Sequence, residues 1–177
     1  MATLPSEVLG VPRPDWMEDD VAMLEDMASR WLEAEVVPHY DRYEKQEMVD
    51  RSAWEGAGAA GLLCASMPEE YGGSGGTYAH EAAIIEALGR TGTDGFGIAL
   101  HNAIVAPYIL HFGSEEQKQK WLPKMATGEM IGAIAMTEPG AGSDLQGIKT
   151  TAKKDGNHYV INGSKTFITN GQHANLI

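Results

Sequence analysis

The pattern of hydrophobic and polar residues divides the chain near residue 128. Before that point, apolar residues recur at helical spacing in segments that end at proline, glycine or capping residues. This pattern predicts helices over residues 15–38, 39–46, 52–61, 77–92, 93–112 and 114–125. Residues 1–14 contain three prolines and little periodicity, so we interpret them as an arm.

Helix starts are indicated by residues that cap a helix. Asp15 and Glu18 have the spacing of a capping box, as do Ser114 and Gln117, and Ser52 is a candidate cap for a short helix. The segment 93–112 is apolar almost all round, which predicts a helix in the middle of a bundle.

Cys64 lies in the short apolar run 62–67, which we expect to be buried. It is the only cysteine, so an internal disulfide and a cysteine metal cluster are excluded. We interpret Cys64 as a buried thiol rather than a nucleophile.

After residue 128 the pattern becomes typical of strands. Met130–Met136 suits a buried strand, and β-rich runs follow at 148–153, 158–161, 165–169 and 174–177. Asp155-Gly156-Asn157 and Asn162-Gly163-Ser164 are hairpin signals between these runs. We predict an α+β fold with a helical bundle at 1–128 and an antiparallel β domain at 129–177. The last run reaches the end of the chain, so we expect the β domain to be incomplete and the chain to be the front part of a longer protein.

The stretch 133–147 combines a strand end with a glycine-rich turn. Gly140, Gly142 and Gly147 would let the backbone turn through positive φ and let a ligand come close. Thr137 and Ser143 add hydroxyl groups. Such a turn suits a flat, acceptor-rich ligand or an anion, although a turn without any ligand is the alternative.

Two phosphate-binding motifs fail at this turn. Ile148 separates Gly147 from Lys149, so the lysine is out of register for a P-loop. Leu145 stands where a dinucleotide fingerprint needs its third glycine.

Charge excludes further classes of partner. The net charge is −12, which argues against nucleic acid and against an anionic membrane surface. No apolar run is long enough to span a bilayer, and residues 1–16 lack the pattern of a leader peptide, so we expect a cytoplasmic protein. The six histidines lack ligand spacing, and we expect no metal site.

The stretch 135–147, AMTEPGAGSDLQG, resembles the signature of the acyl-CoA dehydrogenase flavoprotein family. Supporting resemblances follow in order from about residue 15, at 68–73, 113–118, 121–123, 161–165 and 167–171. The resemblance implies a helical domain, a central β domain and a second helical domain. The last of these has no counterpart in the 177 residues.

The resemblance also implies FAD as cofactor and assigns its contacts by position. The first flavin segment comprises Ile134, Ala135, Met136, Thr137, Gly142 and Ser143, and the second comprises Phe167, Ile168 and Thr169. Ser143 would also contact the acyl-CoA substrate. Ile134 stands where many relatives have an aromatic residue, and Phe167 where many have tryptophan.

The reaction implied is removal of the acyl α-proton by a base and transfer of a β-hydride to flavin N5. The family's base lies in the C-terminal domain, so we expect no catalytic residue here and no turnover by this chain alone. Glu138 and Asp144 are expected to hold the turn. The intact protein would form a homo-oligomer and pass electrons to an electron-transfer flavoprotein. The alternatives are a related acyl-CoA oxidase and a non-catalytic, flavin-free module that pairs through its open β edge.

Overall fold

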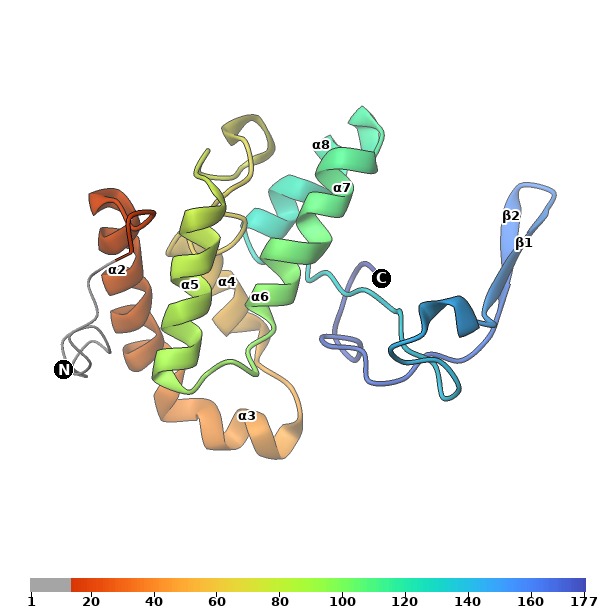
Figure 1. Cartoon of the computed structure of the whole chain (residues 1–177), viewed down its shortest axis with the longest axis horizontal. Helices are drawn as coiled ribbons and strands as arrows, with labels where there is room; N and C mark the ends of the chain where they lie inside the picture. Colours follow the sequence, from red (N-terminus) through yellow and green to blue (C-terminus); the bar gives the residue numbers. More distant parts are fainter. Residues whose placement is uncertain (1–13) are drawn as a thin grey trace.

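The computed structural model describes residues 14–177, so nearly all of the predicted arm lies outside the described residues (Figure 1). The α-helices are α2 (Asp19–Glu35), α3 (Tyr40–Gln46), α4 (Arg51–Ala59), α5 (Tyr78–Thr91), α6 (Ile98–Leu100), α7 (Ala106–Phe112) and α8 (Glu115–Ala126). Short 3-10 turns are η1 (Val37–His39), η2 (Glu69–Tyr71) and η4 (Leu145–Gly147), and a π-helical turn is η3 (His101–Val105). The strands are β1 (Thr151–Asp155) and β2 (His158–Asn162). The predicted α+β class is confirmed.

The core of the helical part surrounds Trp54 on α4. Its indole is fully buried and meets the ring of Phe96 edge-on, with centroids 5.0 Å apart. Helices α2 and α5 run side by side and cover this core (Figure 1). The apolar run before η2 is buried as predicted, including the Cys64 thiol, and its burial raises the pKa of that thiol. Burial of these apolar side chains is what holds the helices together.

Helix caps agree with the sequence at α8 and differ at α2 and α4. The Gln117 amide donates to Ser114 Oγ at 3.3 Å, and the Ser114 amide donates to the Gln117 side chain at 2.8 Å. The capping box predicted at Asp15 is wrong, because α2 starts after Glu18 and Asp20 accepts a bond from the Val21 amide within the first turn. An acid inside the first turn also favours the helix dipole.

The segment predicted as one helix over 93–112 begins only at Ile98 and includes the π-helical turn η3. Proline at 107 explains the irregular turn, since it has no amide hydrogen and its ring crowds the preceding turn. The prediction that this helix lies in the middle of a bundle is also wrong, because one of its faces is not covered. That face exposes Ile104, Tyr108 and Phe112.

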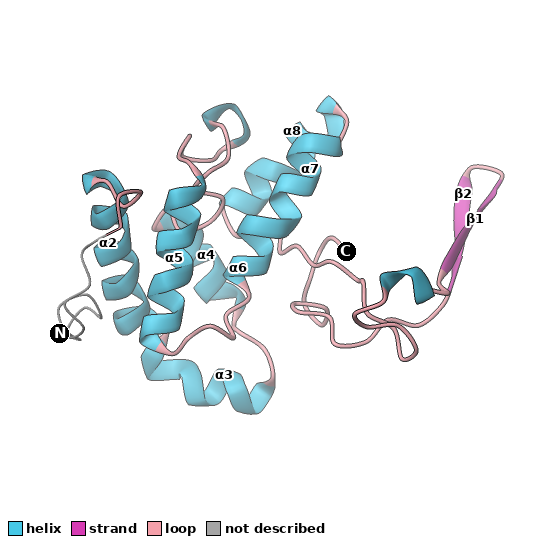
Figure 2. Cartoon of the chain, viewed as in Figure 1, coloured by secondary structure: helices cyan, strands magenta, loops and turns pink. Residues whose placement is uncertain are grey.

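Other corrections concern Ser52 and the strands. Ser52 lies inside α4, whose N-cap is the extended residue Asp50. The Asp155-Gly156-Asn157 hairpin is confirmed, with Asp155 paired to His158. The runs 130–136, 165–169 and 174–177 are not strands (Figure 2). The first and last are joined by a few backbone hydrogen bonds, which form one isolated parallel bridge between Gly132 and Leu176. A segment forms a strand only where a neighbouring segment supplies a ladder of hydrogen bonds. Most segments beside these three runs are loops, which do not supply such a ladder.

The hairpin lies away from the helices, at the far side of the loops that follow residue 128 (Figure 1). Every residue of β1 and β2 is exposed. Within residues 14–177, no helix is both long and apolar enough to cross a membrane.

Candidate functional site

The glycine-rich turn is closed by two backbone hydrogen bonds. The Glu138 amide donates to the Ala141 carbonyl at 2.9 Å, and the Ala141 amide donates back at 3.1 Å. Gly140, Gly142 and Gly147 do not adopt positive φ, so that part of the prediction is wrong. A Cβ at Gly140 or Gly142 would meet no atom of the described chain within 4 Å, which leaves this backbone open to close approach from outside.

The amides beside this turn are also available as donors. Among residues 14–177, no group accepts a hydrogen bond from the amides of Gly142 and Ser143. Both residues are exposed. The turn therefore offers backbone donors without a side chain in front of them, as an acceptor-rich ligand requires.

Glu138 holds the turn to the chain on either side of the hairpin. Its side chain is 7% exposed and accepts bonds from the amides of Lys149 at 2.8 Å and Thr150 at 2.9 Å. The Lys165 ammonium lies 3.0 Å from the same carboxylate. The role predicted for Glu138, holding the turn, agrees with these contacts.

These contacts keep Glu138 ionised. The side chain of Thr150, the amide of Lys149 and then the Lys165 side chain lower the pKa of Glu138 to about 2, against the smaller opposing effect of burial. A carboxylate so well stabilised attracts a proton weakly at neutral pH. Glu138 is therefore suited to fixing geometry and poorly suited to abstracting a proton.

The two segments assigned to a flavin lie side by side. The Thr166 amide donates to the Thr137 carbonyl at 3.0 Å, and Lys165 Nζ donates to the Met136 carbonyl at 2.9 Å. Phe167 is 91% exposed, and Thr169 is exposed beside it. The structure thus places the residues just before the second segment against Met136 and Thr137 of the first segment.

His101 anchors the start of the first segment to the helices. The Gly132 amide donates to Nδ1 at 3.1 Å, so the proton of the neutral ring is on Nε2, 3.2 Å from the Met125 carbonyl. The ring is fully buried, and burial lowers the pKa of His101 to about 4. A neutral histidine with both nitrogens engaged has a structural role here.

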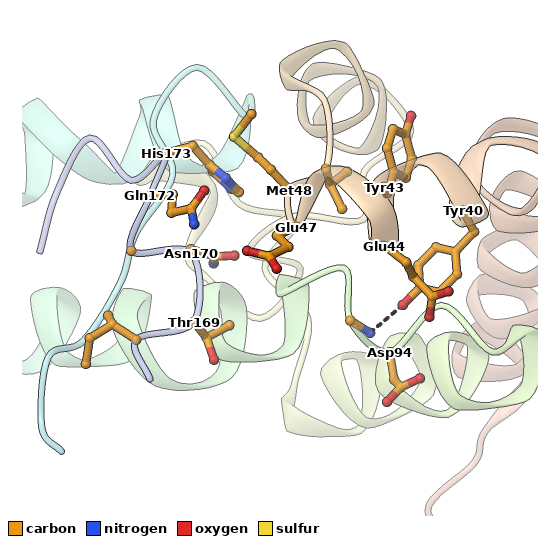
Figure 3. Close-up of a pocket in the computed structure, with 14 residues that line it drawn as sticks. Tyr40, Tyr43, Glu44, Glu47, Met48, Asp94, Thr169, Asn170, Gln172 and His173 are labelled. Atoms are coloured by element: carbon orange, nitrogen blue, oxygen red, sulfur yellow. Dashed lines mark hydrogen bonds between the residues drawn. The ribbon is translucent and has the colours of Figure 1, made fainter. Parts of the chain in front are cut away.

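A cavity of about 490 Å³ lies where the second segment faces the helices (Figure 3). Ile168 and Thr169 line one side, and Tyr40, Glu44 and Asp94 line the other. The Gly95 amide donates to the Tyr40 hydroxyl at 2.8 Å along this wall. Of the predicted site residues, only Ile168 and Thr169 line this cavity.

Sequence reasoning missed three residues that organise the site: His101, Lys165 and Asn170. The Asn170 amide bridges the carbonyls of Gly97 and Gly132, at 3.2 Å each. The Asn170-Gly171 pair could have signalled a left-handed turn, which Asn170 adopts with φ of 65°. The other two had no local signal, because their partners are distant in sequence.

Across residues 14–177, no group of three histidine, cysteine, aspartate or glutamate side chains is placed to hold a metal ion. The glycine turn offers instead the open backbone amides of Gly142 and Ser143.

The comparisons with known families account for this arrangement. The acyl-CoA dehydrogenase N-terminal domain matches residues 18–129, and the acyl-CoA dehydrogenase middle domain matches residues 133–177. The chain belongs to the acyl-CoA dehydrogenase family.

Relatives and solved structures agree with this acyl-CoA dehydrogenase assignment. A long-chain specific acyl-CoA dehydrogenase of Sus scrofa is 44% identical over 169 residues, which are 96% of this chain and 39% of the relative. The crystal structure of an acyl-CoA dehydrogenase from Geobacillus kaustophilus is 49% identical with a TM-score of 0.88, covering 93% of this chain and 44% of that one. An acyl-CoA dehydrogenase from Bacillus anthracis, crystallised with FAD, is 38% identical with a TM-score of 0.81, covering 96% and 30%.

The chain therefore spans less than half the length of these family members. A further solved structure, described as electron transferring flavoprotein of Acidaminococcus fermentans, is 39% identical with a TM-score of 0.78, and the match covers 89% of this chain and 42% of that one.

The cytoplasmic location expected from the sequence is contradicted. The relatives from Sus scrofa, Mus musculus and Rattus norvegicus are named as mitochondrial enzymes. The lack of an apolar run long enough to span a bilayer thus carried no information about the compartment.

Proposed function

We propose that this chain supplies the N-terminal part of an FAD-dependent acyl-CoA dehydrogenase, which removes two hydrogens from the α and β carbons of an acyl-CoA thioester. The observation that carries the proposal is the hydrogen bond from the Thr166 amide to the Thr137 carbonyl. It sets the two hydroxyl-bearing segments of the family signature side by side, next to an open glycine turn.

The proposed domain boundary lies after residue 128. Residues 1–128, with 1–14 as an arm, would form the helical domain, and 129–177 would form the first part of the central β domain. The positions of α2 to α8 within 19–126 and of both strands after 150 support this division.

The residues at the open surface fit a flavin. An isoalloxazine offers several acceptor atoms, which the hydroxyls of Thr137 and Thr169 and the amides of Gly142 and Ser143 would meet as donors. The exposed ring of Phe167 would contact its aromatic system. The proposed FAD contacts are Ile134, Ala135, Met136, Thr137, Gly142, Ser143, Phe167, Ile168 and Thr169, and Ser143 would also contact the acyl-CoA substrate.

FAD, when bound, supplies the hydride acceptor, and the residues of this chain would orient it and keep water away. The base is not proposed among them. Glu138 is held as a carboxylate by Lys165 and two amides, and Asp144 accepts a bond from the Gln146 amide within its own turn. We propose that the α-proton is taken by a residue outside these 177 and that this chain alone has no turnover.

The partners proposed for the whole protein follow from the family. They are an acyl-CoA in fatty acid metabolism, an electron-transfer flavoprotein as electron acceptor, and further copies of the same chain.

The flavin assignment is tested with isosteric substitutions. Thr137→Val and Thr169→Val each remove a proposed donor hydroxyl but keep the shape, and we expect each to weaken FAD binding about tenfold, the cost of one lost hydrogen bond. Quenching of FAD fluorescence measures the affinity. Thr151→Val on β1 is the matched control and should bind like the wild type, so equal affinities for all four proteins would contradict the assignment.

The absence of a base is tested separately. We expect the purified chain, mixed with FAD, an acyl-CoA and an artificial electron acceptor, to show no turnover. Sustained reduction of the acceptor would overturn the claim that the base lies elsewhere. Stoichiometric peroxide formed by the full-length protein would favour an oxidase.

A further inference from the structure

The loop that carries the second flavin segment and Asn170 has an unusual backbone. Phe167 and Asn170 both adopt left-handed conformations, with φ of 55° and 65°. Residues other than glycine rarely adopt this region, and they stay there only when neighbouring contacts hold them. Phe167 is 91% exposed, so contacts of its own side chain do not hold it.

Asn170 makes the contacts that hold this loop. Its Nδ2 donates to the carbonyls of Gly97 and Gly132, at 3.2 Å each. Gly97 immediately precedes α6, and Gly132 lies two residues before Ile134. One side-chain amide thus connects the helices, the first flavin segment and the second flavin segment.

The backbone of Asn170 closes the other side of the loop. Its carbonyl accepts bonds from the amides of His173 at 3.1 Å and Ala174 at 2.8 Å. The side chain and the backbone therefore fix the residue on both sides, which sets the direction in which Phe167 and Thr169 leave the loop.

Gly97 is shaped for this contact. A Cβ added there would lie 2.3 Å from Asn170 Oδ1. Any side chain at 97 must therefore displace Asn170, so the glycine and the asparagine form a matched pair.

We propose that Asn170 is a positioning residue that sets the spacing of the two flavin segments through the carbonyls of Gly97 and Gly132. This inference rests on the proposed FAD site. The chemistry is specific for asparagine. Two carbonyl oxygens need a donor, and a carboxylate of the same size would present only acceptors to them. Glycine at 170 would keep the left-handed backbone but lose the bridge.

The test uses the whole chain and the variants Asn170→Asp, Asn170→Gly, Gly97→Ala and the double variant Gly97→Ala/Asn170→Gly. Asn157→Asp, at the exposed hairpin turn, is the matched control. FAD affinity is measured by fluorescence quenching, and the visible circular dichroism of bound flavin reports its surroundings. Amide hydrogen exchange over residues 166–176 is measured without FAD, and far-ultraviolet circular dichroism verifies the helices.

We expect Asn170→Asp to weaken FAD binding at least about tenfold and to speed exchange over residues 166–176. Gly97→Ala should have the same two effects. In the double variant, the missing side chain makes room for the new Cβ, so it should bind FAD no more weakly than Asn170→Gly alone. Asn157→Asp should behave as wild type.

Each remaining outcome has a definite meaning. A wild-type chain that binds no FAD overturns the proposed function for this chain. Wild-type FAD affinity and flavin dichroism in Asn170→Asp overturn the positioning role and leave the proposed function standing. Weaker FAD binding in Asn170→Asp with unchanged amide hydrogen exchange also overturns the positioning role, because Asn170 would then act on the flavin directly. If the losses of FAD affinity in Gly97→Ala and Asn170→Gly add up in the double variant, the pairing of Asn170 with Gly97 is contradicted.

Discussion

The helical part and the part after residue 128 are held together by different forces. In the helical part, large apolar side chains such as Trp54, Leu62 and Phe96 are fully buried. After residue 128, both strands are exposed throughout, and Ile131 is the one large apolar side chain of the described residues there that is fully buried. The second part is instead held by polar contacts of His101, Glu138 and Asn170.

This difference separates stability from site geometry. Apolar burial is strong but not directional, whereas hydrogen bonds contribute less and fix distances and angles. Changes in the helical core should therefore alter the unfolding of the whole chain. Changes among the polar contacts should loosen the site while the helices stay folded.

The largest expected contrast comes from deleting one aromatic ring in each part. Trp54→Ala should lower the free energy of unfolding by about 3–5 kcal/mol, because it leaves a cavity in the core. Tyr159→Ala, on a strand where the ring is 64% exposed, should change it by less than about 0.5 kcal/mol. Urea unfolding followed by circular dichroism measures both, and a similar loss from the two variants would break the comparison.

A smaller effect is expected from acid at the junction of the two parts. Burial lowers the pKa of folded His101 to about 4 from its usual 6.5, so the unfolded chain binds the proton first as the pH falls. The contribution of neutral His101 to the free energy of unfolding is thus fully present above pH 6.5. It falls by about 3 kcal/mol between pH 6.5 and 4. Unfolding curves over this range measure the slope. His101→Gln should flatten it, whereas His111→Gln, at an exposed position, should not.

The smallest effect is expected at Glu138. Glu138→Gln keeps the size of the side chain but removes the charge that Lys165 and two amides face, so exchange of the Lys149 and Thr150 amides should rise about tenfold. The urea midpoint of the helices should not move. The control Glu55→Gln, exposed in the middle of α4, should change neither quantity. Helices that unfold earlier in Glu138→Gln would show that the two parts share one cooperative unit.

Lowering the pH should reproduce the effect of Glu138→Gln over a pH range of its own. The folded pKa of Glu138 is about 2, below the usual 4.5, so the contribution of this carboxylate is present above pH 4.5 and is lost between pH 4.5 and 2. This pH range lies mainly below the range in which the His101 contribution is lost. One acid titration therefore separates the two sites.

The sequence predicted helical structure better than strands because helix signals are local. The capping box at Ser114 and the helix after Thr77 were both read correctly, since each depends on residues within one turn. The apolar run 130–136 was read as a strand, yet strand identity depends on partners far along the chain, and Gly132 pairs only with Leu176. The start of the 93–112 helix was misplaced because Gly95 is bound to Tyr40, a partner 55 residues away.

The candidate site shows the same limit. The family resemblance assigned flavin contacts to two segments, and the structure sets these segments side by side. The connections between them could not be read locally. Lys165 reaches Met136 across 29 residues, and Asn170 reaches Gly97 across 73. The assignment of individual residues to FAD stays a prediction.

The burial of Cys64 makes this protein well suited to site-specific labelling. The single thiol is fully enclosed and its pKa is raised, so maleimide reagents should not reach it in the folded chain. Asn157→Cys would place one reactive thiol at the exposed hairpin turn. A single fluorophore attached there would follow movement of the hairpin relative to the four tryptophans, which all precede residue 128, without prior removal of the native cysteine.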